Sequence, residues 1–147
     1  MSSISNTFAN ELANLLFNNT DIADIGDAGG IQNSVTVGSL FLHLHIADPG
    51  DAGNSSTSEA TYGSYSAVAV NRTAGGWTVA GRLATNTADI VFPTRSDVGT
   101  EIQTHWSIAK EISGTSVIVF KGALSTSLTV TQNIAPRITA GSLDINF

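Results

Sequence analysis

The hydrophobic positions of residues 1–19 recur with the period of an α-helix. One face of this helix would carry large apolar side chains, namely Ile4, Phe8, Leu12, Leu15 and Leu16. Ser3 or Ser5 can serve as the N-cap, and Asn18 and Asn19 supply a C-terminal stop because asparagine tolerates the left-handed conformation. The pattern therefore predicts one helix. It either packs on its own domain or docks as an arm on a neighbouring subunit.

From residue 40 onward the pattern changes to alternation of apolar and polar side chains. This alternation is clearest in residues 40–46, 102–108 and 142–147. Shorter segments rich in Val, Ile, Thr or aromatic residues lie between them, separated by Gly and Pro: 66–72, 77–79, 82–86, 89–92 and 116–124. Short strands with one buried and one polar face are typical of antiparallel sheets. We expect a mainly β fold, either an antiparallel β-sandwich or a jelly-roll-like barrel, with an N-terminal helix.

A connector rich in aspartate and glycine joins the helix to the strands. It predicts a division into an N-terminal helix and connector arm, residues 1–39, and a β-sandwich domain, residues 40–147. Asp21, Asp24 and Asp27 resemble a calcium loop only loosely, because alternate ligands, a central glycine and a distal glutamate are not all present. We expect a turn-rich loop there and no metal site.

The composition is unusual in its shortage of charge. The 147 residues include 6 Lys and Arg and 12 Asp and Glu, for a net charge of −6, so 12% are charged where about 25% is typical. Seventeen Ser, 17 Thr and 11 Asn take their place, and the mean hydropathy is +0.14. A surface so poor in charge suggests extensive contact with other protein chains.

The same composition excludes several classes of protein. No apolar run approaches the roughly 18 residues of a transmembrane helix, and the first residues do not read as a secretory signal. With no cysteine, there is no disulfide, thiolate metal site or cysteine nucleophile. The few Lys and Arg are scattered singly, so we expect neither a membrane nor a nucleic acid as partner.

Three histidines are candidate metal ligands. His43 and His45 share one face of a strand, and His105 lies on another. They could bind zinc only if the two strands paired in the required register. Because His43 and His45 occupy the polar phase of their strand, we expect surface or interface histidines and no metal.

Three carboxylates gather in residues 48–61, which we expect to be an exposed loop. Asp48, Asp51 and Glu59 could supply a general acid and base for glycoside hydrolysis, but that chemistry also needs a cleft lined by aromatic residues. Turn chemistry explains the segment better, since Asp-Pro-Gly at 48–50 forms tight turns. The chain has no nucleophile elbow, phosphate loop or dinucleotide fingerprint, so we expect no enzyme and no cofactor.

The stretch from residue 42 to 53, Leu-His-Leu-His-Ile-Ala-Asp-Pro-Gly-Asp-Ala-Gly, resembles a motif of a structural protein family of tailed bacteriophages. Other parts similar to that family follow along nearly the whole chain: residues 25–30, 59–65, 69–72, 76–79, 90–93, 104–108, 122–124 and 140–143. Two single positions depart from the family's usual pattern. Ile46 stands where threonine is usual, and Ser66 stands where an arginine is common.

The resemblance implies a small virion structural protein. We expect a capsid decoration (cement) protein that binds the outside of the head shell, with a tail-fibre-like component that binds a receptor or glycan as the alternative. The expected partners are the major capsid protein and further copies of the chain, in a trimer, after assembly in the host bacterial cytoplasm. The interface residues that we expect are the helical stripe Ile4, Phe8, Leu12, Leu15 and Leu16, together with Ile22, Ile25, Tyr62 and Tyr65.

Overall fold

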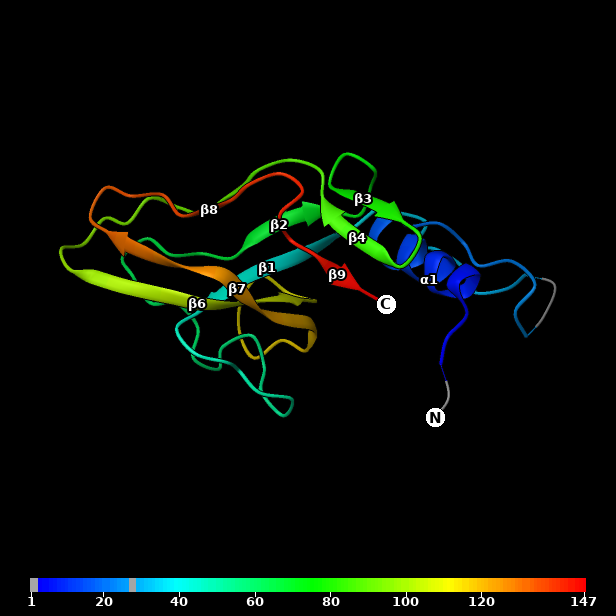
Figure 1. Ribbon diagram of the computed structural model, residues 1–147, viewed down its shortest axis with the longest axis horizontal. Coiled ribbons are helices and arrows are strands. Elements are labelled where there is room, and N and C mark those ends of the chain that lie inside the picture. The colour runs from blue at the N-terminus through cyan, green and yellow to red at the C-terminus, as the bar shows by residue number, and fades with distance from the viewer. Residues whose placement is uncertain (1–2, 27–28) are drawn as a thin grey trace. The chain divides into compact units, whose positions relative to one another are not determined.

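The computed structural model describes residues 3–26 and 29–147 (Figure 1). The described part has the helix α1 (Asn6–Asn18) and the strands β1 (Ser39–His45), β2 (Val68–Asn71), β3 (Trp77–Ala80), β4 (Leu83–Asn86), β5 (Ile90–Val91), β6 (Thr100–Ala109), β7 (Ile118–Thr131), β8 (Arg137–Ile138) and β9 (Ile145–Asn146). Their sheets have the orders β2-β1-β6-β7, β3-β4-β9 and β5-β8. The expected mainly β, antiparallel fold with an N-terminal helix is confirmed, and the described strands form no closed barrel.

The chain forms two compact units. Unit 1 contains Met1–Ser39, Asn71–Asp89 and Ile138–Phe147, and unit 2 contains Leu40–Val70 and Ile90–Arg137. The boundary expected after residue 39 coincides with a boundary between units. The first 39 residues do not stand alone, however, because two later segments join them in unit 1.

Unit 1 is organised by α1 and its packing on β3 and β4. The helix begins as expected, since the Ser5 hydroxyl accepts a hydrogen bond from the Phe8 N–H, and it ends at Asn19, whose φ of 54° is left-handed. Ala9, Ala13 and Phe17 form its buried face. The helix therefore packs on its own unit, which was one of the two expected arrangements.

Aromatic rings fill the centre of unit 1. The Phe17 ring lies 4.7 Å from that of Trp77 and 6.0 Å from that of Phe147, in tilted and edge-on geometries. Both Phe17 and Trp77 are fully buried. Rings in such arrangements combine a large buried apolar area with favourable quadrupole contacts.

Unit 2 is built on the pairing of β1 with β6 and of β6 with β7. In the first pair, Phe41 lies opposite Ala109 and His45 lies opposite His105. In the second pair the register shifts: between the pairs Gln103–Leu128 and His105–Ala123, β6 advances by 2 residues (105 − 103) and β7 by 5 (128 − 123). Strand β7 thus carries three extra residues, as in a large β-bulge.

The burial of residues in β6 corrects one detail of the expected alternation. Ile102, placed in the apolar phase, is 50% exposed, whereas Gln103, placed in the polar phase, is fully buried. Strand β7 is also longer than expected, since it continues from the predicted segment to Thr131, and β8 is not predicted from the sequence. Among the described residues, no helix has the length and apolar character needed to cross a membrane.

Candidate functional site

The most densely connected part of unit 2 lies around the end of β1. Residues 58–60 extend the sheet beside this strand, because the Ile46 N–H donates to the Ser58 carbonyl at 2.8 Å and the Ala60 N–H donates to the Leu44 carbonyl at 2.9 Å. The segment 48–61, expected to be an exposed loop, therefore folds back on the sheet and buries Ser55 and Ala60.

His43 lies under this segment, fully buried, with an acceptor at each ring nitrogen. Its Nδ1 is 2.6 Å from Glu59 Oε1, and its Nε2 is 3.0 Å from the Glu111 carbonyl oxygen. The ring therefore connects a side-chain oxygen and a backbone oxygen from two segments that are distant in sequence. It joins the segment 58–60 to the turn that follows β6.

His45 is also fully buried, but its partners fit the neutral ring. Its Nδ1 donates to the Thr57 carbonyl at 2.9 Å, and its Nε2 accepts from the Ser107 hydroxyl at 2.7 Å. Burial lowers the pKa of His45 below its ordinary value, since desolvation disfavours the charged form. The Ser107–His45 contact resembles a nucleophile with its base, but both residues are fully buried, so a substrate cannot reach them.

The expectation that His43 and His45 lie at the surface or in an interface is wrong. The alternation of apolar and polar residues predicts that both side chains lie on the polar side of β1. In the structure that side is covered by residues 57–60 and by the turn after β6. His105 lies opposite His45 in the register, and its Nδ1 contacts the Thr104 hydroxyl. Within residues 3–26 and 29–147, no three His, Cys, Asp or Glu side chains are grouped so as to hold a metal ion.

The three candidate carboxylates fall into two groups. Glu59 pairs with His43, whereas Asp48 and Asp51 both contact the Lys121 ammonium, at 3.0 and 3.2 Å. Asp48 also accepts the Gly50 N–H at 2.9 Å, which is the expected turn contact. That hydrogen bond and Lys121 lower the pKa of Asp48. Asp48 and Asp51 therefore share one ammonium group, whereas Glu59 has its partner elsewhere.

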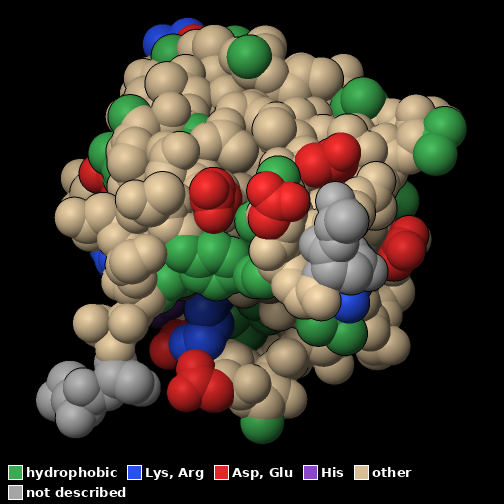
Figure 2. All heavy atoms as spheres, turned by 90° about the vertical axis from the view of Figure 1, so that its right-hand side faces the viewer, with side chains coloured by type: hydrophobic (Ala, Val, Ile, Leu, Met, Phe, Trp, Pro, Cys, Tyr) green, Lys and Arg blue, Asp and Glu red, His purple; other side chains and the backbone are tan. Residues whose placement is uncertain are grey.

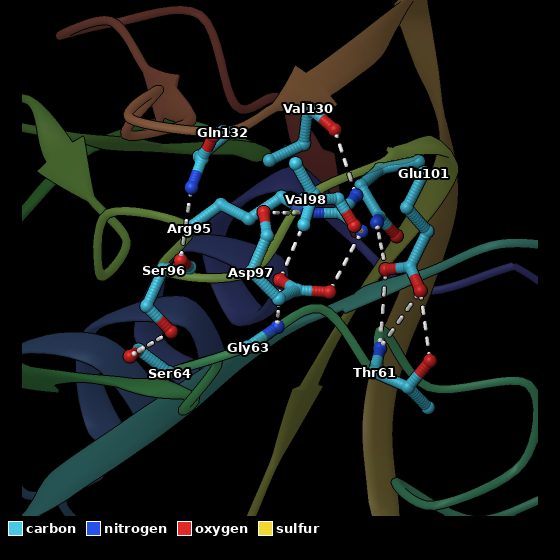
Figure 3. Close-up of polar contacts among 11 residues, drawn as sticks. Thr61, Gly63, Ser64, Arg95, Ser96, Asp97, Val98, Glu101, Val130 and Gln132 are labelled. Atoms are coloured by element: carbon cyan, nitrogen blue, oxygen red, sulfur yellow. Dashed lines mark hydrogen bonds and ion pairs between the residues drawn. The ribbon is translucent and has the colours of Figure 1, made fainter.

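A second polar network centres on Arg95, which is buried (Figure 3). Its Nε and Nη2 each donate to an oxygen of Asp97 at 2.9 Å, and its Nη1 donates to the Val130 carbonyl at 3.0 Å. Asp97 also accepts the Gly63 N–H at 2.6 Å. Arg95 and this N–H lower the pKa of Asp97. A Cβ at residue 63 would lie 2.7 Å from the Asp97 oxygen, so glycine permits this close approach.

Glu101 continues the network toward the segment that covers β1. Its carboxylate accepts the hydroxyl hydrogen bond of Thr61 at 2.8 Å, the Thr61 N–H, and the side-chain amide of Gln103 at 2.6 Å (Figure 3). Arg95, Asp97 and Glu101 were not singled out from the sequence. The Arg-x-Asp spacing indicates a bidentate pair, but Thr61, Gly63 and Val130 each lie more than thirty residues from the side chain that they contact.

Comparison with known protein families shows which family the chain belongs to. A family model described as "Podophage GP4 fiber I protein gp80" matches residues 3–146. The chain belongs to this family. It is a structural protein of the phage virion, and the resemblance to tailed-phage virion proteins noted in the sequence is confirmed. No curated protein matches the chain significantly.

The gp80-family motif of residues 42–53 now has a structural meaning. Its first part is the buried end of β1 with His43 and His45, and its second part is the turn in which Asp48 caps Gly50. The motif thus encodes a strand and the turn that starts the covering segment. The acidic residue that follows it, Glu59, is the ion-pair partner of His43.

The expected interface residues fall into two groups. Within the described residues, Ile22 and Tyr62 are buried in the cores of their own units, where the Tyr62 hydroxyl donates to the Pro93 carbonyl and burial raises the pKa of Tyr62 to about 12. Their side chains are therefore unavailable to a partner. The others retain part of their surface: Ile4, Phe8, Leu12, Leu15, Leu16, Ile25 and Tyr65. Tyr65 is anchored internally, since its hydroxyl accepts the Leu44 N–H.

Proposed function

We propose that the chain is a subunit of a fibre on the phage virion. The observation that carries this proposal is the match to the family model over residues 3–146, because the description of that model names a podophage fibre protein. The surface suits a subunit that contacts other chains. In Figure 2, charged side chains are scattered among neutral side chains and backbone, in keeping with the 12% of charged residues.

A fibre subunit outside the cell has to keep its loops in place without disulfides, since the chain has no cysteine. The His43–Glu59 pair and the Arg95–Asp97 pair support this role. Each belongs to a hydrogen-bond network that ties a loop of unit 2 to a distant part of the same unit. We infer a structural role without catalysis, in a homo-oligomer for which we expect three copies.

Capsid decoration, the role expected from the sequence alone, is the competing prediction. It requires the same kind of charge-poor surface, so surface composition does not separate the two roles. The printed description of the family favours the fibre. The two roles differ in stoichiometry, because decoration proteins occupy repeated positions over the whole shell whereas fibres occupy a few symmetric attachment points.

The copy number per virion therefore tests the proposal. Purified virions are separated by denaturing electrophoresis, and the band of this chain is quantified against the bands of the major capsid and portal proteins. A fibre subunit gives a small multiple of the portal copy number. A copy number comparable with that of the major capsid protein would overturn the proposal and support decoration.

A further inference from the structure

The polar face of β1 is closed by a short strap, residues 57–60, whose sequence is Thr-Ser-Glu-Ala. The strap pairs with the last residues of β1, because the Ile46 N–H donates to the Ser58 carbonyl and the Ala60 N–H donates to the Leu44 carbonyl. Of its four residues only Ala60 is buried. The strap is therefore held by polar contacts with little apolar packing, a combination that favours local opening.

The chain on each side of the strap is fastened separately. Before it, the Ser55 N–H donates to the Ser116 carbonyl at 3.0 Å, and the Ser55 hydroxyl donates to the Gly114 carbonyl at 2.8 Å. After it, the Thr61 hydroxyl donates to the Glu101 carboxylate at 2.8 Å. The strap therefore has a fixed point at each end, and it can move without displacing the loop before it.

The backbone of the strap is strained at its second residue. Ser58 has a φ of 53°, in the left-handed region that residues other than glycine adopt only rarely. Such a conformation persists where the surrounding contacts hold it in place. The Thr57 carbonyl, just before it, accepts from the His45 ring at 2.9 Å. The Glu59 carboxylate, just after it, contacts the His43 ring at 2.6 Å, so the two histidines of β1 hold Ser58 in this conformation.

A proton on His45 would disturb these contacts. The ring is fully buried, and its two nitrogens face the Thr57 carbonyl and the Ser107 hydroxyl, neither of which carries a charge. Because the Ser107 hydroxyl donates to Nε2, an added proton would set two donors against each other there. A charge without an ionic partner is costly in a buried site, and burial lowers the pKa of His45 accordingly. Lifting the strap would expose the ring to water and remove this cost.

Other titratable and charged groups face His45 from each element around it. They are His43 on its own strand, Glu59 on the strap, His105 on β6, and Lys121 on β7 with its partners Asp48 and Asp51. Positive charge on His43, whose ring centroid is 6.5 Å away, or on His105 opposes a proton on His45. The Glu59 carboxylate favours that proton, but burial outweighs it, since the pKa of His45 is lowered.

We propose that residues 57–60 act as an acid-sensitive strap, which lifts from β1 when His45 takes up a proton. Lifting breaks the contacts between the strap and the two histidines, and it frees the Leu44 carbonyl and the Ile46 N–H at the edge of β1. The fixed points on both sides confine the change to the strap. A fall in pH thus exposes a short stretch of sheet edge while the rest of unit 2 stays folded. The inference does not depend on the fibre assignment.

Hydrogen exchange of the purified full chain, resolved to single amides at pH 7.5 and 5.5, tests the strap. The protection factor of an amide corrects for the direct effect of pH on exchange. For the Ile46 and Ala60 amides it should fall about three- to tenfold, because one proton taken up below pH 6.5 changes the opening equilibrium by at most about tenfold per pH unit. Unchanged protection of both amides would overturn the proposal.

Low concentrations of urea show whether the strap opens alone or unit 2 unfolds. Opening of the strap exposes little surface, so urea below the unfolding transition should leave the protection of the Ile46 and Ala60 amides unchanged. Amides in the centre of the sheet, at residues 106–108 of β6, exchange by larger openings and should lose protection as urea rises. An equal dependence on urea in both sets would mean that unit 2 opens as a whole, which contradicts a separate strap.

Two matched variants assign the proton to His45. His45→Asn keeps a donor for the Thr57 carbonyl but does not titrate, so the pH dependence of protection should disappear. His105→Asn, on the neighbouring strand, should keep the pH dependence of the wild type. The wild-type measurements decide whether the strap opens even where His45→Asn folds poorly. A pH dependence that survives in folded H45N, or that disappears in H105N, would overturn the assignment to His45.

Discussion

The two units of this protein are stabilised by different means. Of the nine buried polar or charged side chains among the described residues, seven lie in unit 2, namely His43, His45, Ser55, Arg95, Gln103, Ser107 and Ser116, and two, Asn19 and Asn86, lie in unit 1. The two in unit 1 are amides that do not titrate, and its centre is the Phe17–Trp77–Phe147 cluster. Unit 1 should therefore depend on packing, and unit 2 on charge and pH as well.

The largest expected effect is the loss of the aromatic centre of unit 1. Trp77→Ala removes a fully buried ring against Phe17 and should lower the free energy of unfolding by about 3–5 kcal/mol. Urea unfolding measures this loss, and hydrogen exchange locates it in peptides of unit 1. Thr78→Ala, on the exposed side of the same strand, should cost far less. Equal losses would show that the ring is not central.

The next effect concerns the charged network of unit 2. Arg95→Met removes the hydrogen bonds that Arg95 donates to Asp97 and to the Val130 carbonyl, and leaves Asp97 with the Gly63 N–H. The free energy of unfolding should fall by about 2 kcal/mol, less than for a fully buried pair because Asp97 is 46% exposed. Lys110→Met, at an exposed position, is the control. Hydrogen exchange should rise in residues 61–64 and 130–134 and stay unchanged in unit 1. A rise confined to unit 1 would contradict the contrast between the units.

A smaller effect follows from the lowered pKa of His45. Burial makes the ring harder to protonate in the folded chain than in the unfolded chain, where its ordinary pKa is 6.5, so protonation favours unfolding. Its contribution is therefore fully present above pH 6.5 and is lost as the pH falls below that value. Unit 2 should therefore lose stability as the pH falls from 6.5 to 5.5. Hydrogen exchange of both units at the two pH values measures this difference.

His45→Asn sharpens the pH experiment, because its amide can still donate to the Thr57 carbonyl but does not titrate. The variant should be less sensitive to pH in this range, while His105→Asn on the neighbouring strand should behave like the wild type. A pH dependence that survives in the His45 variant would assign it to another group. Asp97, whose pKa is lowered, stabilises the folded chain at every pH above its ordinary value of 3.8 and loses this contribution only below that value, so it does not interfere.

The smallest effect is local to α1. Ser5→Ala removes the N-cap acceptor of the Phe8 N–H and should cost roughly 0.5–1 kcal/mol. Fraying measured by hydrogen exchange should be confined to the first turn of the helix. A loss that reached unit 2 would mean that the units do not respond separately.

The sequence predicts best those features that depend on near neighbours. The caps at Ser5 and Asn19, the Asp48 turn and the alternation in β1 all follow from residues within one or two turns of chain. The buried helix face was missed because Ala9 and Ala13 are small, whereas the predicted stripe, adjacent to it, consists of large side chains that are only partly covered.

The polar sites were less predictable, since their partners are distant in sequence. His43 was placed at the surface because nothing in its own strand reveals that residues 57–60 and the Glu111 carbonyl cover it. Likewise, the partners of the Arg95–Asp97 pair are distant in sequence. Arg95 donates to the Val130 carbonyl, and Asp97 accepts the Gly63 N–H. The three extra residues in β7 could not be predicted either, because the local pattern of β7 does not show where its register with β6 changes.

The position of the chain on the virion tests the central proposal most directly. Gold-labelled antibody against the chain, applied to intact virions and examined by electron microscopy, reports that position without isolating the protein. We predict label on fibres at a few fixed sites of each particle and an unlabelled head shell. Label distributed evenly over the head would contradict the fibre assignment and support capsid decoration instead.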